Sequence, residues 1–144
     1  TGVQTCALPI FATIMSRAET DWGAGDGDPA DVFARMLDSG QPYFERAARC
    51  NGFTPVQALL RHARQFDDPT GLAAIASNSA LQARTRAAND LIELLLTRGE
   101  SGILHSLAAN PDVSQRVLRE AGERDSSVTE RARLTIWQVY GERL

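Results

Sequence analysis

Two histidines, His62 and His105, and the cysteine Cys50 are the side chains of this chain best suited to metal or nucleophilic chemistry. A zinc site needs three or four ligands at short, recurring spacings, and no second histidine or cysteine lies one helical turn from either histidine. No histidine or acid is placed by the sequence to activate Cys50. We therefore expect solvated or structurally bonded histidines and a small core residue at Cys50.

The carboxylates between Glu93 and Glu130 are scattered along expected helix ends and polar faces. Capping explains several of them: Asp112 suits the start of a helix, and Ser127 with Glu130 forms an S-x-x-E capping box. The acidic segment 16–28 lacks the ligand spacing of a calcium loop, and the other glycines occur singly, which excludes a phosphate-binding loop. We therefore expect no enzyme, no cofactor and no metal site.

All fifteen basic residues are arginine, while the net charge of the chain is -3. The absence of lysine indicates a GC-rich, bacterial genome. Interleaved acids such as Glu120 favour a solvated face with local ion pairs, so nucleic-acid binding is kept only as the alternative function. Seven arginines would line up as a ridge if successive helices stack: Arg84, Arg86, Arg116, Arg119, Arg124, Arg131 and Arg133.

Apolar residues recur at helical spacing throughout residues 29–144, with no alternation typical of strands. The clearest stretch is 89–133, where short helical patterns repeat at roughly two dozen residues. A unit that short buries its apolar face only against neighbouring units. We expect at least six helices and essentially no sheet, with helix starts at Asp28-Pro29, Pro42 and Thr54-Pro55.

The first ten residues, TGVQTCALPI, resemble a translated sequencing adapter, so residues 1–10 are expected to be non-native. Residues 11–28 are expected to form a flexible leader, and residues 29–144 one helical repeat domain. With Cys6 in the adapter-like part, Cys50 would stand alone, which suits a reducing cytoplasm. No apolar run approaches the length of a membrane span, and we expect a cytoplasmic protein with no membrane partner.

The segment Leu107–Leu134 resembles a leucine-rich-repeat-variant unit. The resemblance lies in the run LAANP at 107–111, followed by Val117-Leu118, Ala121 and a polar turn at Asp125. It covers about a third of the chain well and is loose between residues 29 and 88. It implies an all-α fold, a short right-handed α-solenoid of HEAT-like repeats, with a protein-binding role. The clustered cysteines that hold an iron–sulfur module in some such proteins are absent, so the resemblance implies no cofactor.

The last helix, expected from about Val128 to Tyr140, has apolar residues on two faces when drawn at 100° per residue. One face, which includes Ile136 and Val139, should pack on the preceding repeat. The opposite face carries Leu134 and Trp137, where a terminal helix would be polar. Two large apolar residues there indicate either that a further repeat once followed or that this face meets a partner. We therefore expect Trp137 to be substantially exposed, and we expect a protein-interaction module that self-associates or binds a partner through this end. The expected partner-binding residues are Leu134, Trp137, Arg116 and Arg119.

Overall fold

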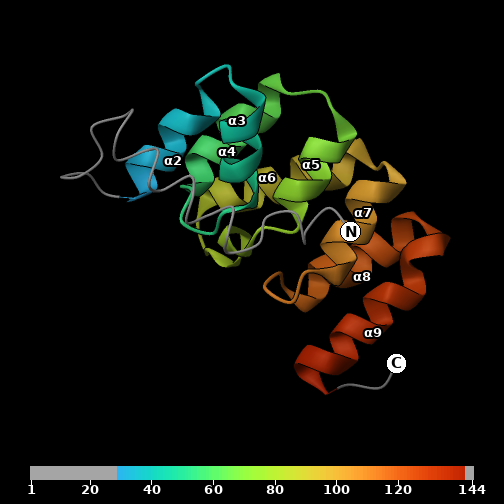
Figure 1. The fold of residues 1–144 in the computed structure, drawn as a ribbon. Coiled ribbons are helices and arrows are strands. Elements are labelled where there is room, and N and C mark those ends of the chain that lie inside the picture. Colours follow the sequence, from blue (N-terminus) through green and yellow to red (C-terminus); the bar gives the residue numbers. More distant parts are fainter. Residues whose placement is uncertain (1–28, 142–144) are drawn as a thin grey trace.

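The computed structural model describes residues 29–141, and within this range the chain forms eight α-helices and two short 3-10 helices without a strand (Figure 1). The all-α expectation is confirmed for this part of the chain. The expectations for residues 1–28 lie outside the described residues. In chain order the elements are α2 (Pro29–Leu37), α3 (Pro42–Cys50), α4 (Val56–Gln65), α5 (Pro69–Ala76), η3 (Ser79–Gln82), α6 (Arg86–Arg98), α7 (Ser101–Ala109), α8 (Gln115–Arg124), η4 (Ser126–Val128) and α9 (Thr129–Tyr140).

The helices pack in two rows that run from one end of the molecule to the other (Figure 1). One row contains α3, α5, α7 and α9, each in contact with the next. In the other row, α2 packs on α4 and α4 on α6. α8 lies at the far end, against α7 and α9. From α2 to α7, consecutive α-helices alternate between the two rows.

Proline begins three of the helices, α2, α3 and α5. Its ring fixes φ near the helical value, and the missing N–H is one that a helix start leaves unbonded anyway. Side-chain oxygens also accept hydrogen bonds from amides that have no partner within their helix. Asp68 accepts from Thr70 N, Thr85 from Ala88 N, and Ser114 from Val117 N. The helix starts expected at prolines 29 and 42 are confirmed.

Three expected caps are wrong. Ser114, rather than Asp112, caps α8. The hydroxyl of Thr54 donates to the Ala48 carbonyl at 2.6 Å, so it ties the α3–α4 loop to α3 and leaves α4 without a side-chain cap. Before α9, Asp125 accepts from the Ser127 amide at 2.9 Å and begins η4, so no Ser127–Glu130 capping box forms.

Helix α6 lies at the centre of a single hydrophobic core. Its residues Leu91, Leu95 and Leu96 are fully buried, because the helix is covered by α4, α7 and η3. Burial around most of its circumference is what the leucine-rich sequence of 91–96 predicts, and this is confirmed. The fully buried Leu107 and Leu118 continue the same core toward α9.

Three asparagines at the ends of the inner-row helices form a ladder of hydrogen bonds. Asn78 Nδ2 donates to the carbonyls of Arg49 and Asn51, at 2.8 and 3.0 Å. Asn110 Nδ2 donates to the carbonyls of Ala76 and Asn78, at 2.9 and 3.2 Å. Asn78 and Asn110 therefore each bond to the turn one helix pair earlier, 27 and 32 residues back for the Asn51 and Asn78 carbonyls.

The same three asparagines share one local turn. The Oδ1 atoms of Asn51, Asn78 and Asn110 each accept from the amide two residues later, at 2.8–2.9 Å. Asn78 and Asn110 are almost completely buried. With all their polar atoms bonded, these side chains satisfy backbone groups that the ends of α3 and α5 would otherwise bury without partners.

The buried and exposed faces of α9 agree with the expectation except in its last turn. Val128, Ala132 and Ile136 are buried, and Leu134 and Trp137 lie on the outside. Val139, expected to pack with Ile136, is exposed instead. The last turn of α9 lies toward the end of the molecule (Figure 1), where the described part of the chain leaves Val139 uncovered.

None of the helices in residues 29–141 combines the length and the apolar character that crossing a membrane requires.

Candidate functional site

The outer face of α9 carries a stripe of large apolar side chains, Leu134, Trp137 and Tyr140, which we call the C-terminal patch. Trp137 is 50% exposed and Leu134 is 39% exposed. The Tyr140 hydroxyl donates to the Val113 carbonyl at 3.2 Å, which anchors one edge of the patch to the α7–α8 loop. The exposure expected for Trp137 is therefore confirmed. Large apolar side chains grouped in this way mark interaction surfaces more often than isolated ones do.

The other two expected partner-binding residues, Arg116 and Arg119, lie exposed on α8. Arg116 pairs with Glu120 at 3.1 Å and with Glu93 of α6 at 3.9 Å. These partners belong to α8 and α6, so Arg116 is held along the α6–α8 side of the molecule. Arg116 is therefore not part of the C-terminal patch.

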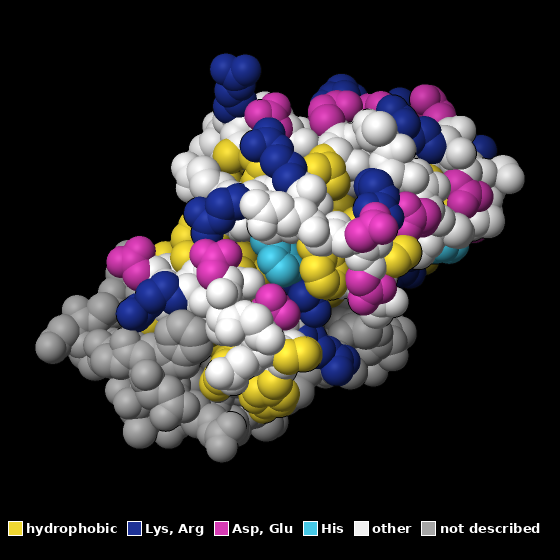
Figure 2. All heavy atoms as spheres, turned by 90° about the horizontal axis from the view of Figure 1, so that it is seen from above, with side chains coloured by type: hydrophobic (Ala, Val, Ile, Leu, Met, Phe, Trp, Pro, Cys, Tyr) yellow, Lys and Arg dark blue, Asp and Glu magenta, His cyan; other side chains and the backbone are white. Residues whose placement is uncertain are grey.

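Four of the seven arginines of the expected ridge have an acidic partner in the structure. Arg86, Arg124 and Arg133 each have an acidic partner on their own helix. Arg131 lines the groove described below. Basic and acidic side chains alternate across the face shown in Figure 2. Local pairing of this kind screens the charge that a nucleic-acid backbone would need.

His62 and Phe66 of the α4 end form a cluster with Arg49 of α3. Arg49 Nη1 lies 3.4 Å from His62 Nε2, and the guanidinium carbon lies 4.6 Å from the centroid of the Phe66 ring. The rings of His62 and Phe66 stack with centroids 4.8 Å apart. Phe66 in turn lies over Gly71 of α5, where a Cβ atom would collide with the phenyl ring. The cluster therefore joins α3, α4 and α5.

Burial shapes the electrostatics of this cluster. Removal from water lowers the pKa of Arg49, with partial compensation from Glu45 and Asp68. The pKa of His62 is also lowered, first by burial and then by the positive charge of Arg49. An arginine only donates hydrogen bonds, so His62 Nε2 must accept, which requires the neutral imidazole. His62 is thus structurally bonded, as expected, whereas His105 is exposed on α7.

Cys50 is half-buried at the end of α3, and its sulfur is not a free thiol. The expectation of a lone core cysteine is therefore wrong, and Cys50 no longer supports a reducing compartment.

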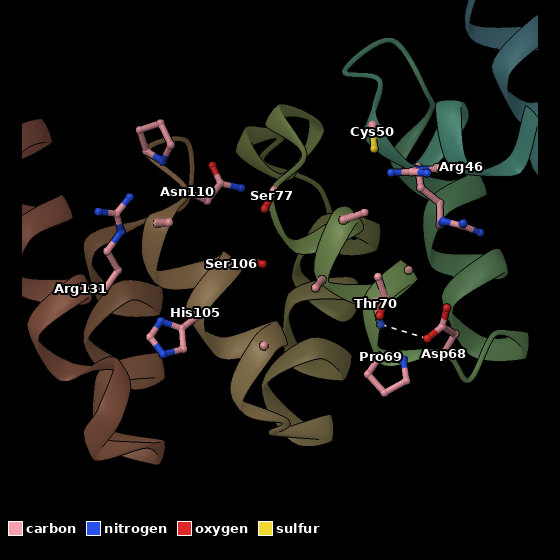
Figure 3. Close-up of a pocket in the computed structure, with 17 residues that line it drawn as sticks. Arg46, Cys50, Asp68, Pro69, Thr70, Ser77, His105, Ser106, Asn110 and Arg131 are labelled. Carbon is pink, nitrogen blue, oxygen red and sulfur yellow. Dashed lines mark hydrogen bonds between the residues drawn. The ribbon is translucent and has the colours of Figure 1, made fainter. Parts of the chain in front are cut away.

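A groove with a volume of about 1020 Å³ crosses the inner row of helices (Figure 3). Small side chains of α5 and α7 line its middle. Arg46 and Arg49 of α3 line one end, while Arg131 of α9 lines the other, with His105 close by (Figure 3). The small residues of the middle are Gly71, Ala73, Ala74, Ser77, Gly102, Ser106 and Ala109.

The groove has small side chains in its middle and charged side chains at its ends. Asp68 is the single carboxylate among its described lining residues, against three arginines. Asp68 is also engaged, because its Oδ1 accepts from the Thr70 amide at 3.1 Å. Arg49 is only 9% exposed, and its Nε has no hydrogen-bond partner. A buried donor without a partner is uncommon and costly in a folded protein.

Sequence reasoning missed this groove. Its arginines come from residues 46, 49 and 131, which no local pattern connects. The available signal was the run of small residues at helical spacing in α5 and α7, which also reads as ordinary close helix packing.

Among residues 29–141, no three His, Cys, Asp or Glu side chains gather closely enough to hold a metal ion. Comparison of the chain with protein-family models, with curated proteins and with solved structures finds no match. Function is therefore inferred from the surfaces of the described residues themselves.

Proposed function

We propose that this chain is a non-enzymatic protein-interaction module, built as a short right-handed α-solenoid of stacked helical repeats. The C-terminal patch is the observation that carries the proposal. A helix face that no other helix covers is normally polar, whereas α9 exposes Leu134 and Trp137 on a face that no described helix covers. Covering these side chains removes apolar surface from water, which drives association.

The asparagine ladder supports the repeat architecture in this proposal. Asn51, Asn78 and Asn110 occupy equivalent turns, and each later asparagine bonds to the turn before it. The repeat unit is then one inner helix, its asparagine turn and one outer helix. Units that contact only their neighbours leave a continuous face across the stack, which is the surface such proteins use for binding.

The first partner we expect at the C-terminal patch is a second copy of the chain. The test is sedimentation velocity of the full chain and of Trp137→Ser over a range of concentrations. Trp137→Ser should weaken self-association about tenfold or more, since exposed aromatic anchors dominate interface energies. The free energy of unfolding should change by less than about 0.5 kcal/mol, as for other surface substitutions.

Gln138→Ser, on the adjacent exposed position of α9, is the matched control and should leave association unchanged. Unfolding of Trp137→Ser would show that Trp137 belongs to the core and would refute the proposed interface. A chain that stays monomeric at all concentrations would refute self-association. Retention on heparin or mixed oligonucleotides that falls steeply with salt would instead favour the alternative function, nucleic-acid binding.

A further inference from the structure

We infer that the C-terminal patch of one copy of the chain docks on the opposite end of a second copy, so that the copies stack head to tail. The inference rests on the proposed function of a protein-interaction module and concerns the surface that the patch meets. That surface is the side of α3 that carries Tyr43 and Ala47, which we call the N-terminal face. Helix α3 begins the row of helices that α9 ends (Figure 1).

Large exposed apolar side chains gather at the two ends of the described helix stack. They are Tyr43 and Phe53 at the α3 end, and Leu134, Trp137, Val139 and Tyr140 on α9. Within the described part of the chain, helices α4 to α8 expose none. The ends of a stack are the places where a further helix pair would cover apolar side chains. Both ends therefore offer surface that a neighbouring copy can bury.

Tyr43 points away from the rest of its row. The inward side of α3 carries the buried Ala48 and Arg49, and the Arg49 guanidinium lies 4.6 Å from the centroid of the Phe66 ring. At 100° per residue, Tyr43 lies about 120° from Arg49 around the helix. Tyr43 is 49% exposed, and its ring meets Phe44 edge-on with centroids 6.0 Å apart. The phenol ring is therefore open to a neighbour on the outer side of α3.

The side chains of the two faces have complementary sizes. Leu134 and Trp137 are three residues apart and form one stripe along α9. Ala47 follows Tyr43 by one helical turn, so the N-terminal face has a small side chain next to a large one. Helices pack when the side chains of one enter the gaps between those of the other. Trp137 can enter the gap over Ala47 while Tyr43 packs beside Leu134.

The asparagine ladder gives a second reason for a neighbour at the α3 end. Asn78 and Asn110 each donate from Nδ2 to the turn one helix pair earlier. Asn51 occupies the equivalent turn, and among the described residues its Nδ2 has no earlier turn to which it donates. In a continued stack, the turn before Asn51 is the end of α9 in the adjoining copy. The last carbonyls of a helix have no partner within it, so the end of α9 can accept this hydrogen bond.

A symmetric contact between two C-terminal patches would cover less of this surface. It would bury α9 of both copies and leave Tyr43 and the Asn51 amide as they are. In a head-to-tail contact, each joint buries one end of either kind. Because the two faces of such a contact differ, every copy keeps a further face for binding, and the copies form rings or open chains rather than a closed pair.

Sedimentation velocity of the full chain over a range of concentrations tests the stacking. The mean sedimentation coefficient should rise past the value of a dimer. Tyr43→Ser should weaken association about tenfold or more, as Trp137→Ser does, since aromatic anchors dominate interface energies. Tyr43→Phe keeps the ring and should associate like the unchanged chain. Gln57→Ser, at an exposed position of α4 between the two ends, is the matched control and should have no effect.

A mixture of the two serine variants gives the sharpest result. Tyr43→Ser keeps an intact C-terminal patch, and Trp137→Ser keeps an intact N-terminal face. An equimolar mixture should therefore form dimers with one copy of each variant, and nothing larger, at concentrations where each variant alone is monomeric. Since only folded copies can restore the contact, dimers in the mixture also show that both variants keep their fold.

Two outcomes would overturn the inference. One is association that stops at a dimer and that Tyr43→Ser leaves intact, which would show that the C-terminal patch meets itself. The other is a mixture of the two variants that stays monomeric. In either case Trp137→Ser can still weaken association of the full chain, so the proposed function stands. If Trp137→Ser has no effect, the proposed interface at the C-terminal patch fails as well.

Discussion

The guanidinium of Arg49 contacts His62 and the ring of Phe66, and the Arg49 side chain lines the groove. Burying a charge is costly unless it is paired and hydrogen-bonded, and here one N–H remains unused. The neutral His62 imidazole can accept a hydrogen bond from the guanidinium, which a protonated ring cannot do. At the scale of single residues, the contact between α3 and α4 therefore depends on the protonation state of His62.

This dependence predicts how stability changes with pH. The pKa of His62 is lowered in the folded protein, whereas in the unfolded chain it returns to about 6.5. Below that pH the unfolded state binds more protons, so the free energy of unfolding falls as the pH falls. Urea denaturation between about pH 7 and pH 5 should show this decrease, and His62→Gln should reduce it. If His105→Gln removes the decrease instead, the assignment to His62 is wrong.

Asn78 provides a second test at the scale of residues. Its side chain makes three hydrogen bonds to backbone groups, two at the end of α3 and one at the start of η3. Asn78→Ala leaves those groups buried without partners and should lower the free energy of unfolding by about 2–4 kcal/mol, measured by urea denaturation. Asn89→Ala, at an exposed position of α6, is the control and should cost little. A small effect at Asn78 would mean that water replaces the ladder.

At the scale of elements, local sequence patterns determine where a helix begins and ends. The packing of neighbouring helices determines which of its faces are buried. Proline and the 3.6-residue period place α2, α3 and α5. Whether a helix end is capped by one polar side chain or by another depends on the path of the loop, as at Ser114 and Asp125. Asp112 and Ser127 lie within three residues of these caps and could also cap a helix. The folded loop alone determines which side chain does so.

Burial of α6 and α8 predicts the effect of leucine truncations. Leu95→Ala and Leu118→Ala should each lower the free energy of unfolding by roughly 2–5 kcal/mol, because both side chains are fully buried in the single core. Leu134→Ala removes the same atoms from the exposed face of α9 and is the matched control. Denaturant titration measures all three. Equal effects at Leu134 and Leu118 would contradict the exposure of the C-terminal patch.

At the scale of the whole molecule, two surfaces arise from the row arrangement. The C-terminal patch exists because α9 has no further described helix against its outer face. The groove exists because α5 and α7 line its middle with small side chains. Helices α3 and α9 contribute the arginines at its two ends.

The sequence by itself determined the all-α class, the proline-led helix starts, the buried faces of α6 and α9, and the exposure of Trp137. Each of these follows from residues within a few turns of one another, where helical periodicity is a direct physical constraint. Tertiary structure decided the caps at Ser114 and Asp125, the exposure of Val139 and the Arg49–His62–Phe66 cluster. It also decided the asparagine ladder and the groove, since these join residues about 30 to 80 positions apart, whose proximity depends on how the helix rows pack.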